Sequence, residues 1–453
     1  MRILYRIGAR SIRQVQTRYV EVQAGCVDMI GEALELRRLM NNRGLPSLEL
    51  EAVRDRKLQA LIRHAYENVP YYRSLFQSAG LLPDDIRTVK DLQHIPITTK
   101  DDLRAAGVER STAKGIDLAA CQVVHTSGTT GKPFAIYLTG RELRRRQLIE
   151  FRTLLSIGFR PQDRLAVLGP AQPHAVRFHQ RLGFYRSVNI PPTLSLDDQI
   201  DQLKRSRPTI LWAYPTVLKA LLCRVNYRLD TVVNPRMLIT SAEVCDEILK
   251  AGIHGNLKTE MFNFYGANEV GRIAAECPAH EGLHVNEDHV ILECSNSKYP
   301  GEPGISGEAV VTSLTALAQP FIRYRLGDVY KITKKPCSCG SPFPLISSPL
   351  GRLDDAVKLP SGKIVSLWPF TFILRKLDRL EQYRIIQESA EHLVVELAFR
   401  GDPNKDALVQ LRSRFMEHLG EPVRVDIQCV SGFRNDTPKF RSFISKLSIK
   451  GDS

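Results

Sequence analysis

The chain has 453 residues, of which 43% are hydrophobic and 25% charged, and a formal net charge of +14 at pH 7. This length predicts two domains, one large and one small, with packed globular cores. No apolar run approaches the roughly 18 residues of a membrane span, and the basic start at 1–19 lacks the apolar middle of a signal peptide. We therefore expect a cytoplasmic protein whose nine cysteines are reduced thiols rather than a disulfide framework.

The first predicted element is an amphipathic helix that ends before Pro70, because the residue before a proline disfavours helical backbone. Its apolar residues recur at helical spacing and fall on one face: Leu58, Leu61, Ile62 and Ala65. Such a pattern is typical of a helix that buries one side and exposes the other.

Two predicted strands, 122–125 and 134–138, flank a loop rich in hydroxyl groups and glycine. The loop consists of Thr126, Ser127, Gly128, Thr129, Thr130, Gly131, Lys132 and Pro133. Glycine lets backbone N–H groups approach phosphate oxygens, the hydroxyl groups donate hydrogen bonds, and the lysine supplies positive charge. These features predict a loop that holds the phosphates of ATP; the alternative is an ordinary turn between two strands.

This loop differs from a Walker motif. Two residues separate Gly128 from Gly131, where that motif has four, and Pro133 takes the place of the magnesium-binding hydroxyl. The densest basic cluster, 141–146, is expected on a helix after the second strand. We interpret it as a solvated face, with a basic rim that attracts phosphate groups as the alternative. Other basic residues are dispersed, so we expect no nucleic acid as a partner.

The phosphate loop resembles that of the adenylate-forming ligases, a Ser/Thr/Gly run that ends in Gly-Lys-Pro, and the rest of that family's pattern follows in order. Residues 262–269 are similar to its Tyr-Gly-x-Thr/Ser-Glu element. The resemblance implies that Tyr265, followed by Gly266, stacks on adenine and that Glu269 holds Mg²⁺. Asn268 departs from the pattern, so an amide N–H would replace the hydroxyl that contacts the α-phosphate.

Three later segments extend the resemblance. Asp328 ends a run similar to the family's ribose-binding element, and a carboxylate suits a cis-diol because it accepts two hydrogen bonds. Arg352 and Asp354 belong to a segment similar to the one that joins the family's two domains, which implies nucleotide contact for the arginine and a hinge at the aspartate. Lys439, in Thr437-Pro438-Lys439-Phe440, matches the loop of the catalytic lysine.

The resemblance also implies a pocket for the acid that is activated. By position in the family, this pocket borrows from Tyr214, Ser241, Ala242, Glu243 and Phe264. Flat apolar side chains such as Phe264 and Tyr265 suit an aryl or acyl group.

Segments 56–73 and 92–103 are similar to the opening of the phenylacetate–coenzyme A ligase branch, and the likeness extends from about Leu48 to Lys446. It implies an α/β fold: an N-terminal extension at 1–47, a large domain with mixed sheets and helices at 48–352, and a small, mobile α+β domain at 353–453. The large domain would bind ATP and the acid. The small domain reads as strands around 383–398, then a helix that Gly420 can end and a strand over 423–429.

Several cysteines and histidines suggest a metal site. Cys277, Cys337 and Cys339 with one imidazole would form a tetrahedral set for structural Zn²⁺, although the spacing is not that of a standard finger and free buried cysteine is the alternative. Some members of the resembled branch carry a similar Cys-x-Cys-Gly turn. Their Gly-x-His position favours His284 as the imidazole, with His280 in reserve.

Taken together, the resemblance implies AMP-forming activation of a carboxylic acid by ATP and Mg²⁺, followed by transfer to coenzyme A. Transfer to an amine is one alternative, and a non-enzymatic, zinc-containing binding protein on the same fold is another. The joint presence of Lys132, Glu269, Asp328, Arg352 and Lys439 argues against the binding protein. The expected partners are a small carboxylic acid and coenzyme A or an amine, with no membrane span and with a homodimer left open.

Overall fold

The computed structural model describes residues 29–125, 134–169, 180, 183–245, 247–257, 259–295, 306–333, 335–352, 356–367, 370, 373–374, 377, 379–433 and 442–447. The predicted phosphate loop at 126–133, the predicted hinge Asp354 and the predicted catalytic Lys439 lie outside these residues. The first 28 residues of the predicted N-terminal extension lie outside them as well.

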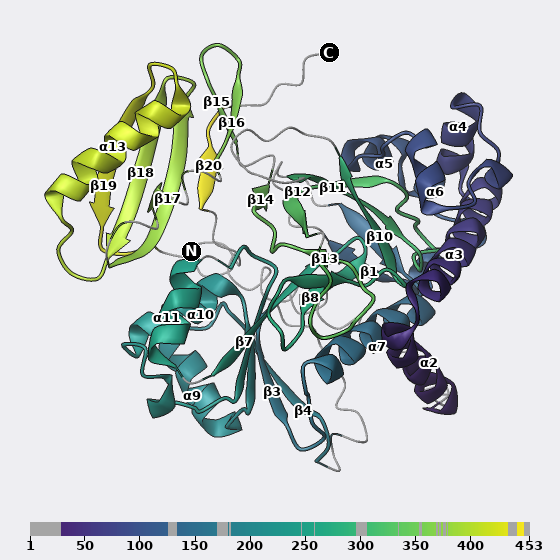
Figure 1. Ribbon diagram of the computed structural model, residues 1–453, viewed down its shortest axis with the longest axis horizontal. Helices are drawn as coiled ribbons and strands as arrows, with labels where there is room; N and C mark the ends of the chain where they lie inside the picture. The colour runs from purple at the N-terminus through teal and green to yellow at the C-terminus, as the bar shows by residue number, and fades with distance from the viewer. Residues whose placement is uncertain are drawn as a thin grey trace, which may run out of the picture.

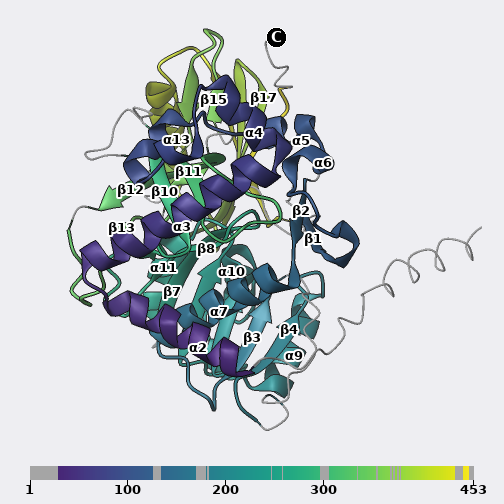
Figure 2. The same cartoon turned by 90° about the vertical axis from the view of Figure 1, so that its right-hand side faces the viewer.

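Helices form the start of the described chain and cover the outside of the main sheet. They are α2 (Met29–Asn41), η1 (Asn42–Gly44), α3 (Ser47–Asn68), α4 (Pro70–Ser78), η2 (Pro83–Asp85), η3 (Val89–His94), α5 (Lys100–Ala106), α6 (Val108–Ser111) and η4 (Leu118–Ala120). Helix α3 buries the predicted face, Leu58, Leu61, Ile62 and Ala65, and ends before Pro70, which confirms the prediction. Figure 2 shows α3 across the outer side of the antiparallel strands and α2 beside α7.

The predicted hairpin around the phosphate loop is confirmed. Strands β1 (Gln122–His125) and β2 (Ala135–Leu138) pair antiparallel, with His125 opposite Ala135 at the loop end. Helix α7 (Gly140–Ser156) follows, and its N-cap Thr139 accepts from the backbone N of Glu142 while the Glu142 side chain bonds back to Thr139. This capping box fixes where the helix begins.

The main sheet has 12 strands in the order β10-β11-β12-β13-β9-β8-β7-β6-β5-β3-β4, with β14 paired to β12. The strands are β3 (Arg164–Leu168), β4 (Arg186–Ile190), β5 (Ile210–Ala213), β6 (Met237–Ser241), β7 (Glu260–Ala267), β8 (Gly271–Glu276), β9 (Leu283–Val285), β10 (Val290–Ser295), β11 (Ser306–Ser313), β12 (Tyr324–Thr333), β13 (Leu345–Ile346) and β14 (Gly351–Arg352). Strands β3, β4, β5, β6 and β7 pair with one another in parallel. The remaining pairs, from β7–β8 to β10–β11, are antiparallel.

Helices connect the parallel strands and pack on their faces: α9 (Leu196–Ser206), α10 (Pro215–Arg224), η5 (Leu229–Thr231) and α11 (Glu247–Asn256). The core between α9, α10 and the sheet contains apolar side chains such as Leu203, Leu218 and Leu238, all of them fully buried. In a parallel sheet the carboxyl ends of neighbouring strands meet at one edge, where ligands bind. Tyr214 and Ser241 lie at these ends of β5 and β6.

The C-terminal part forms a separate lobe, seen apart from the main sheet in Figure 1. It contains β15 (Ala356–Lys358), β16 (Ile364–Ser366), β17 (Leu380–Ser389), β18 (His392–Phe399), α13 (Lys405–Leu419), β19 (Arg424–Val430) and β20 (Phe443–Ser445). Four of these strands form a sheet in the order β19-β18-β17-β20, and Phe370, Leu393 and Phe415 lie in the lobe's own core. Gly420 ends α13 in the left-handed conformation at φ 70, as predicted. The boundary between 352 and 353 stays a prediction.

Candidate active site and metal centre

Three predicted nucleotide residues meet at the junction of β7, β12 and β14. The Tyr265 hydroxyl donates to Asp328 Oδ2 at 2.8 Å, and Arg352 Nη1 donates to Asp328 Oδ1 at 3.2 Å. Asp328 and Arg352 are also opposite each other in the strand register. Burial and the adjacent carboxylate raise the pKa of Tyr265 well above its usual value, so its hydroxyl keeps its proton. The arrangement holds one carboxylate between a fixed donor and a fixed cation.

Glu269 lies two residues beyond the end of β7, close to this junction. The hydroxyl of Tyr324, from β12, donates to its Oε1 at 3.2 Å. Burial raises the pKa of Glu269, while the Tyr324 hydrogen bond and the charge of Lys100 oppose that rise. A shielded carboxylate of this kind suits a hard divalent cation, which takes oxygen ligands.

Arg146 of α7 holds the backbone of this same segment. Its two terminal nitrogens donate to the carbonyl oxygens of Asn268 at 2.7 Å and Glu269 at 2.6 Å. Burial lowers the pKa of Arg146 to about 10, so the guanidinium stays charged at neutral pH. The planar fork thereby fixes the direction in which the Glu269 side chain leaves the main chain.

The prediction of a solvated basic face at 141–146 is therefore wrong in part. Arg141 and Arg144 are exposed, but Arg145 pairs with Glu35 of α2 and Arg146 binds the carbonyls described above. The long arginine side chain reaches across a neighbouring element, so a helical position alone did not indicate its partner.

Asn268 links the Glu269 segment to the root of the predicted phosphate loop. Its side-chain Nδ2 donates to the carbonyl oxygen of His125 at 3.2 Å, at the end of β1. The amide has a second N–H that can face a ligand. The residue that departs from the family pattern therefore lies where the predicted loop begins.

The predicted acid-pocket residues cluster at the carboxyl ends of β5, β6 and β7. Trp212 Nε1 donates to Ser241 Oγ at 2.7 Å, and the Trp212 and Phe264 rings meet edge to face at 5.6 Å. Arg272 lies over the Phe264 ring, with its Cζ 4.7 Å from the centroid. Ala242 adopts φ 69, an uncommon backbone state that turns the chain sharply after β6.

Glu243 has a local role in this structure. Its Oε2 accepts from the backbone N of Thr216 at 3.0 Å and from the Thr216 hydroxyl at 2.7 Å, at the start of α10. The partial positive charge at the start of the helix stabilises a carboxylate in this position. Tyr214, the residue before α10, is buried, which raises its pKa to about 12.

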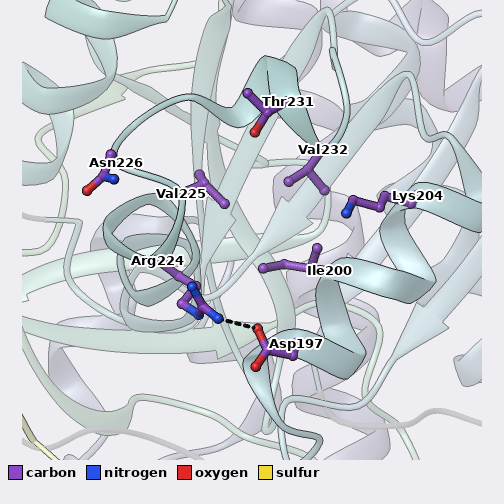
Figure 3. A pocket seen from close by; sticks show the side chains of 8 residues that line it. All are labelled: Asp197, Ile200, Lys204, Arg224, Val225, Asn226, Thr231 and Val232. Carbon is purple, nitrogen blue, oxygen red and sulfur yellow. Dashed lines mark hydrogen bonds and ion pairs between the residues drawn. The ribbon is translucent and has the colours of Figure 1, made fainter.

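A hollow of about 420 Å³ opens between α9 and α10, at the opposite end of α10 from Tyr214 (Figure 3). Its lining consists of Asp197, Ile200, Lys204, Arg224, Val225, Asn226, Thr231 and Val232. Arg224 donates to Asp197 at 2.8 Å across it, and both side chains are mostly exposed. The hollow contains none of the residues that the sequence indicated, so the candidate active site stays at the strand ends.

The four predicted metal ligands come together. The ligand atoms of Cys277, His284, Cys337 and Cys339 all lie within 4.8 Å of one another. Cys277 Sγ is 3.6 Å from Cys337 Sγ, and Cys339 Sγ is 3.3 Å from His284 Nε2. His284 Nδ1 bonds the carbonyl oxygen of Phe343 at 2.8 Å, which leaves Nε2 toward the thiols. Three sulfurs and one imidazole nitrogen fit tetrahedral Zn²⁺.

His280, the reserve ligand, lies away from the thiols. Its ring nitrogens are 3.5 Å from Glu260 and 3.7 Å from Glu276. The hydrogen bond with Glu276 raises the pKa of His280. The geometry therefore favours His284, because strand β9 pairs with β13 and places His284 opposite Leu345, beside the cysteine turn.

A buried ion pair lies beside the candidate metal site, on the side of α7. Arg152 Nη1 donates to Asp288 Oδ2 at 2.6 Å, with both side chains at most 1% exposed. The Arg152 guanidinium also lies 5.3 Å from the centroid of Phe343, whose carbonyl orients His284. Arg152 Nη1 reaches the carbonyl oxygen of Leu39 at 3.1 Å as well.

Sequence reasoning missed five residues of these sites: Arg146, Trp212, Arg272, Tyr324 and Arg152. The motifs pointed to residues close to two of them. Tyr324 lies in the run that ends at Asp328, and Arg272 follows Glu269 by three positions. Their partners come from other elements, so no local spacing indicates them.

Relatives with assigned names identify the family. No family model matches the chain. A phenylacetate–coenzyme A ligase of Thermus thermophilus is 30% identical over 360 residues, which cover 76% of this chain and 79% of the relative. The chain belongs to the phenylacetate–coenzyme A ligase family. A second member, from Escherichia coli, is 31% identical over 299 residues, or 63% of this chain and 67% of that protein.

Solved structures agree with the fold of a phenylacetate–coenzyme A ligase. The chain is similar to a 2-hydroxyisobutyryl-CoA ligase in its postadenylation state in complex with 2-HIB-AMP, with a TM-score of 0.71, 21% identity and coverage of 89% of this chain and 91% of that one. An anthranilate CoA ligase in complex with anthranoyl-AMP matches with a TM-score of 0.52 at 15% identity and covers 85% of this chain and 78% of that one. The predicted family resemblance and mixed α/β fold class are confirmed.

The described part of this ligase contains no helix long and apolar enough to cross a membrane.

Proposed function

We propose that this protein uses ATP to convert an aryl or acyl carboxylic acid into its acyl-adenylate and then forms the thioester with coenzyme A. By family it is an AMP-forming acid–thiol ligase. The observation that carries the residue assignment is the junction of Tyr265, Asp328 and Arg352 beside the half-buried Glu269. A nucleotide that approached the end of β1 would meet all four side chains.

In the first half-reaction a carboxylate oxygen attacks the α-phosphorus of ATP, and the bond to pyrophosphate breaks. Two anions approach each other, so the site must neutralise charge. We assign Asp328 and Arg352 to the nucleotide, the loop 126–132 to the leaving pyrophosphate, and Lys439 to the oxygens of the developing adenylate. Mg²⁺ at Glu269 would lower the charge of the phosphates. Arg146 keeps the Glu269 backbone in place for this task.

In the second half-reaction the sulfur of coenzyme A attacks the acyl carbonyl carbon, and the bond to AMP breaks. We propose that the lobe 353–453 turns about Asp354 between the two steps, which removes Lys439 and admits the thiol. The lobe has its own core and sheet, which supports movement as a unit.

We propose that the acid binds at the ends of β5, β6 and β7, where the side chains favour an aromatic acid. The Trp212 and Phe264 rings and the Arg272 guanidinium stacked on them form a rigid wall. Such a wall suits a flat apolar group, because aromatic side chains bind other rings in offset or edge geometry. The positive φ of Ala242 lets the main chain bend close to that group.

We also propose that Cys277, His284, Cys337 and Cys339 hold one structural Zn²⁺, since a four-ligand site leaves no open position for chemistry. Metal analysis should find about one zinc per chain. Cys337→Ser should release it and lower the melting temperature, whereas Cys429→Ser, which changes an exposed cysteine of the lobe, should not. Protein that carries no zinc at full activity and stability would contradict this assignment. The amine acceptor, the homodimer and the cytoplasmic location stay predictions.

Acid-dependent ATP–pyrophosphate exchange tests the proposed activity. Exchange should appear with one group in a panel of aryl, fatty and amino acids, and coenzyme A should then yield the thioester and AMP. Asp328→Ala should lower exchange at least about 100-fold, as for loss of a transition-state contact. Asp197→Asn, on the exposed outside of α9, is the control. Absence of exchange with every acid, in protein that is folded, would overturn the proposal.

A further inference from the structure

The small lobe contacts the large body at one end of strands β17 and β18. Leu380 pairs with Phe399, so Glu381 and Arg400 lie at this same end. Arg400 Nε donates to Glu381 Oε1 at 2.9 Å, and the Arg400 backbone N donates to the carbonyl of Arg379 at 2.9 Å. These bonds stay within the lobe and hold the arginine in one direction. Its Cζ lies 4.7 Å from the ring centroid of Tyr227, which belongs to the body.

The body side of this contact is rigid. Tyr227 follows α10 in the left-handed conformation at φ 59, and its backbone N donates to the carbonyl of Leu222 at 2.7 Å. The residue is only 6% exposed. Its ring packs on Gly252 of α11, where an added Cβ would come within 2.7 Å of a ring carbon. An uncommon backbone state persists where surrounding structure enforces it, so the ring is presented in a fixed position.

A half-buried thiol completes the contact. Cys223 lies in the last turn of α10, next to the Tyr227 turn. Burial raises the pKa of Cys223, and the nearby Glu381 carboxylate raises it further through its charge and a hydrogen bond. One group from the lobe therefore reaches the thiol while another reaches the ring.

We propose that Arg400 and Glu381 dock on Tyr227 and Cys223 as a reversible contact that holds the lobe in one of its two catalytic orientations. These are positioning residues, since they act by placing the lobe. The inference rests on the proposed function, because it assumes that the lobe turns between half-reactions.

The strength of the contact fits a reversible role. The Arg400 side chain is 54% exposed and the Glu381 side chain 26% exposed. The ion pair lies within the lobe, so the Arg400 cation over the Tyr227 ring is what bears on docking, and an exposed contact of that kind shifts an equilibrium by only about five-fold. A contact of this size biases the lobe without trapping it. By comparison, the body's ion pair between Arg152 and Asp288 is at most 1% exposed and has no such freedom.

A disulfide tests the proposal directly. We expect Glu381→Cys to bring a second thiol near Cys223, because the Glu381 carboxylate acts on that thiol. Oxidised glutathione would then join the two sulfurs, with release of two molecules of reduced glutathione. The two half-reactions are then measured apart: ATP–pyrophosphate exchange, and transfer from preformed acyl-adenylate to coenzyme A. We expect the oxidised variant to keep one half-reaction within about three-fold and to lose the other at least about 100-fold, because a locked lobe cannot turn. Reduction should restore both.

Matched controls separate docking from general damage. Glu381→Cys with Cys223→Ser cannot form the bond and should not respond to oxidant. Arg400→Gln should raise the alkylation rate of Cys223, followed by mass spectrometry, by about five-fold. Arg424→Gln, which removes an exposed arginine paired with Asp426 inside the lobe, should leave that rate unchanged.

The outcomes distinguish failure of the proposed function from failure of the docking contact. If the wild type shows no acid-dependent exchange, the proposed function fails. If the wild type is active but the disulfide does not form, or forms and changes both half-reactions equally, the docking contact is overturned while the function stands.

Discussion

The nucleotide side of the large body and the contact face of the small lobe differ in how they are held. In the body, Asp328 is fixed between Tyr265 and Arg352, and Arg146 grips two carbonyls next to Glu269. The lobe touches the body through Arg400, which is mostly exposed. Under the proposed function, the groups that would meet the nucleotide are thus held in place by polar bonds within the body. Lys439, the group that we propose for the first step only, belongs to the lobe that we propose to turn.

The largest expected effect tests the lobe. Lys439→Ala should lower adenylate formation by about 1,000-fold, since one charge that stabilises the transition state is lost. Transfer from preformed acyl-adenylate to coenzyme A should persist, because the proposed turn of the lobe moves Lys439 away from the site in that step. Separate assays of the two half-reactions measure the split. Lys446→Ala, which removes a lysine paired with Glu388 on the same lobe, is the control. Equal loss in both assays would contradict the proposal that Lys439 of the lobe acts in the first half-reaction only.

The second effect concerns the stability of the body. Arg152→Met leaves Asp288 buried and charged without its partner, which should lower the free energy of unfolding by about 3–5 kcal/mol in urea titrations. Arg228→Gln, from an exposed pair with Asp230, should leave the midpoint unchanged. Adding Asp288→Asn to Arg152→Met should recover part of the loss, because the unpaired charge is gone. A single variant as stable as the wild type would show that this pair is not structural.

The third effect tests how the body presents Glu269. Arg146→Lys replaces a fork that reaches two carbonyls with a single ammonium, and kcat should fall about tenfold while the free energy of unfolding changes little. Titration of Mg²⁺ in the exchange assay should show weaker metal dependence of the rate in this variant. Arg144→Lys on the same helix is exposed and serves as the control. An unchanged kcat would mean that the segment keeps its shape without this clamp.

The smallest effect is a pH dependence. His289 is fully buried, and burial together with the charge of Arg146 lowers its pKa to about 3. The unfolded chain takes up a proton near pH 6.5 while the folded chain does not, so stability falls as pH decreases from 6.5 toward 3. The slope contributed is at most about 1.4 kcal/mol per pH unit. His289→Gln should flatten the curve of unfolding free energy between pH 6.5 and 4.5. His280→Gln should act in the opposite sense, because the raised pKa of His280 stabilises the fold at low pH.

Much of the fold follows from local patterns. The apolar face of α3, the hairpin at 122–138 and the left-handed Gly420 after α13 each depend on a few neighbouring residues, and each is found where periodicity and turn chemistry place it. The order of motifs along the chain also indicated the family, because motifs such as the phosphate loop and the Glu269 element are recognised from residue types alone.

Long-range pairing decided what local patterns left open. The choice of His284 over His280 depends on the pairing of β9 with β13, which joins segments about sixty positions apart. Arg146 was interpreted as a solvated residue because its partners, the carbonyls of Asn268 and Glu269, belong to a distant strand end. Every residue has a backbone carbonyl, so no sequence motif indicates which carbonyls a side chain will bind.

The stacking of Arg152 on Phe343 connects the candidate metal site with helix α2. The same guanidinium bonds Leu39 at the end of α2, and the carbonyl of Phe343 orients His284. Binding of the proposed Zn²⁺ would therefore fix Phe343, against which Arg152 packs, and add to the hold of Arg152 on the end of α2. Protease resistance of α2 would then be higher with the proposed zinc bound than without it.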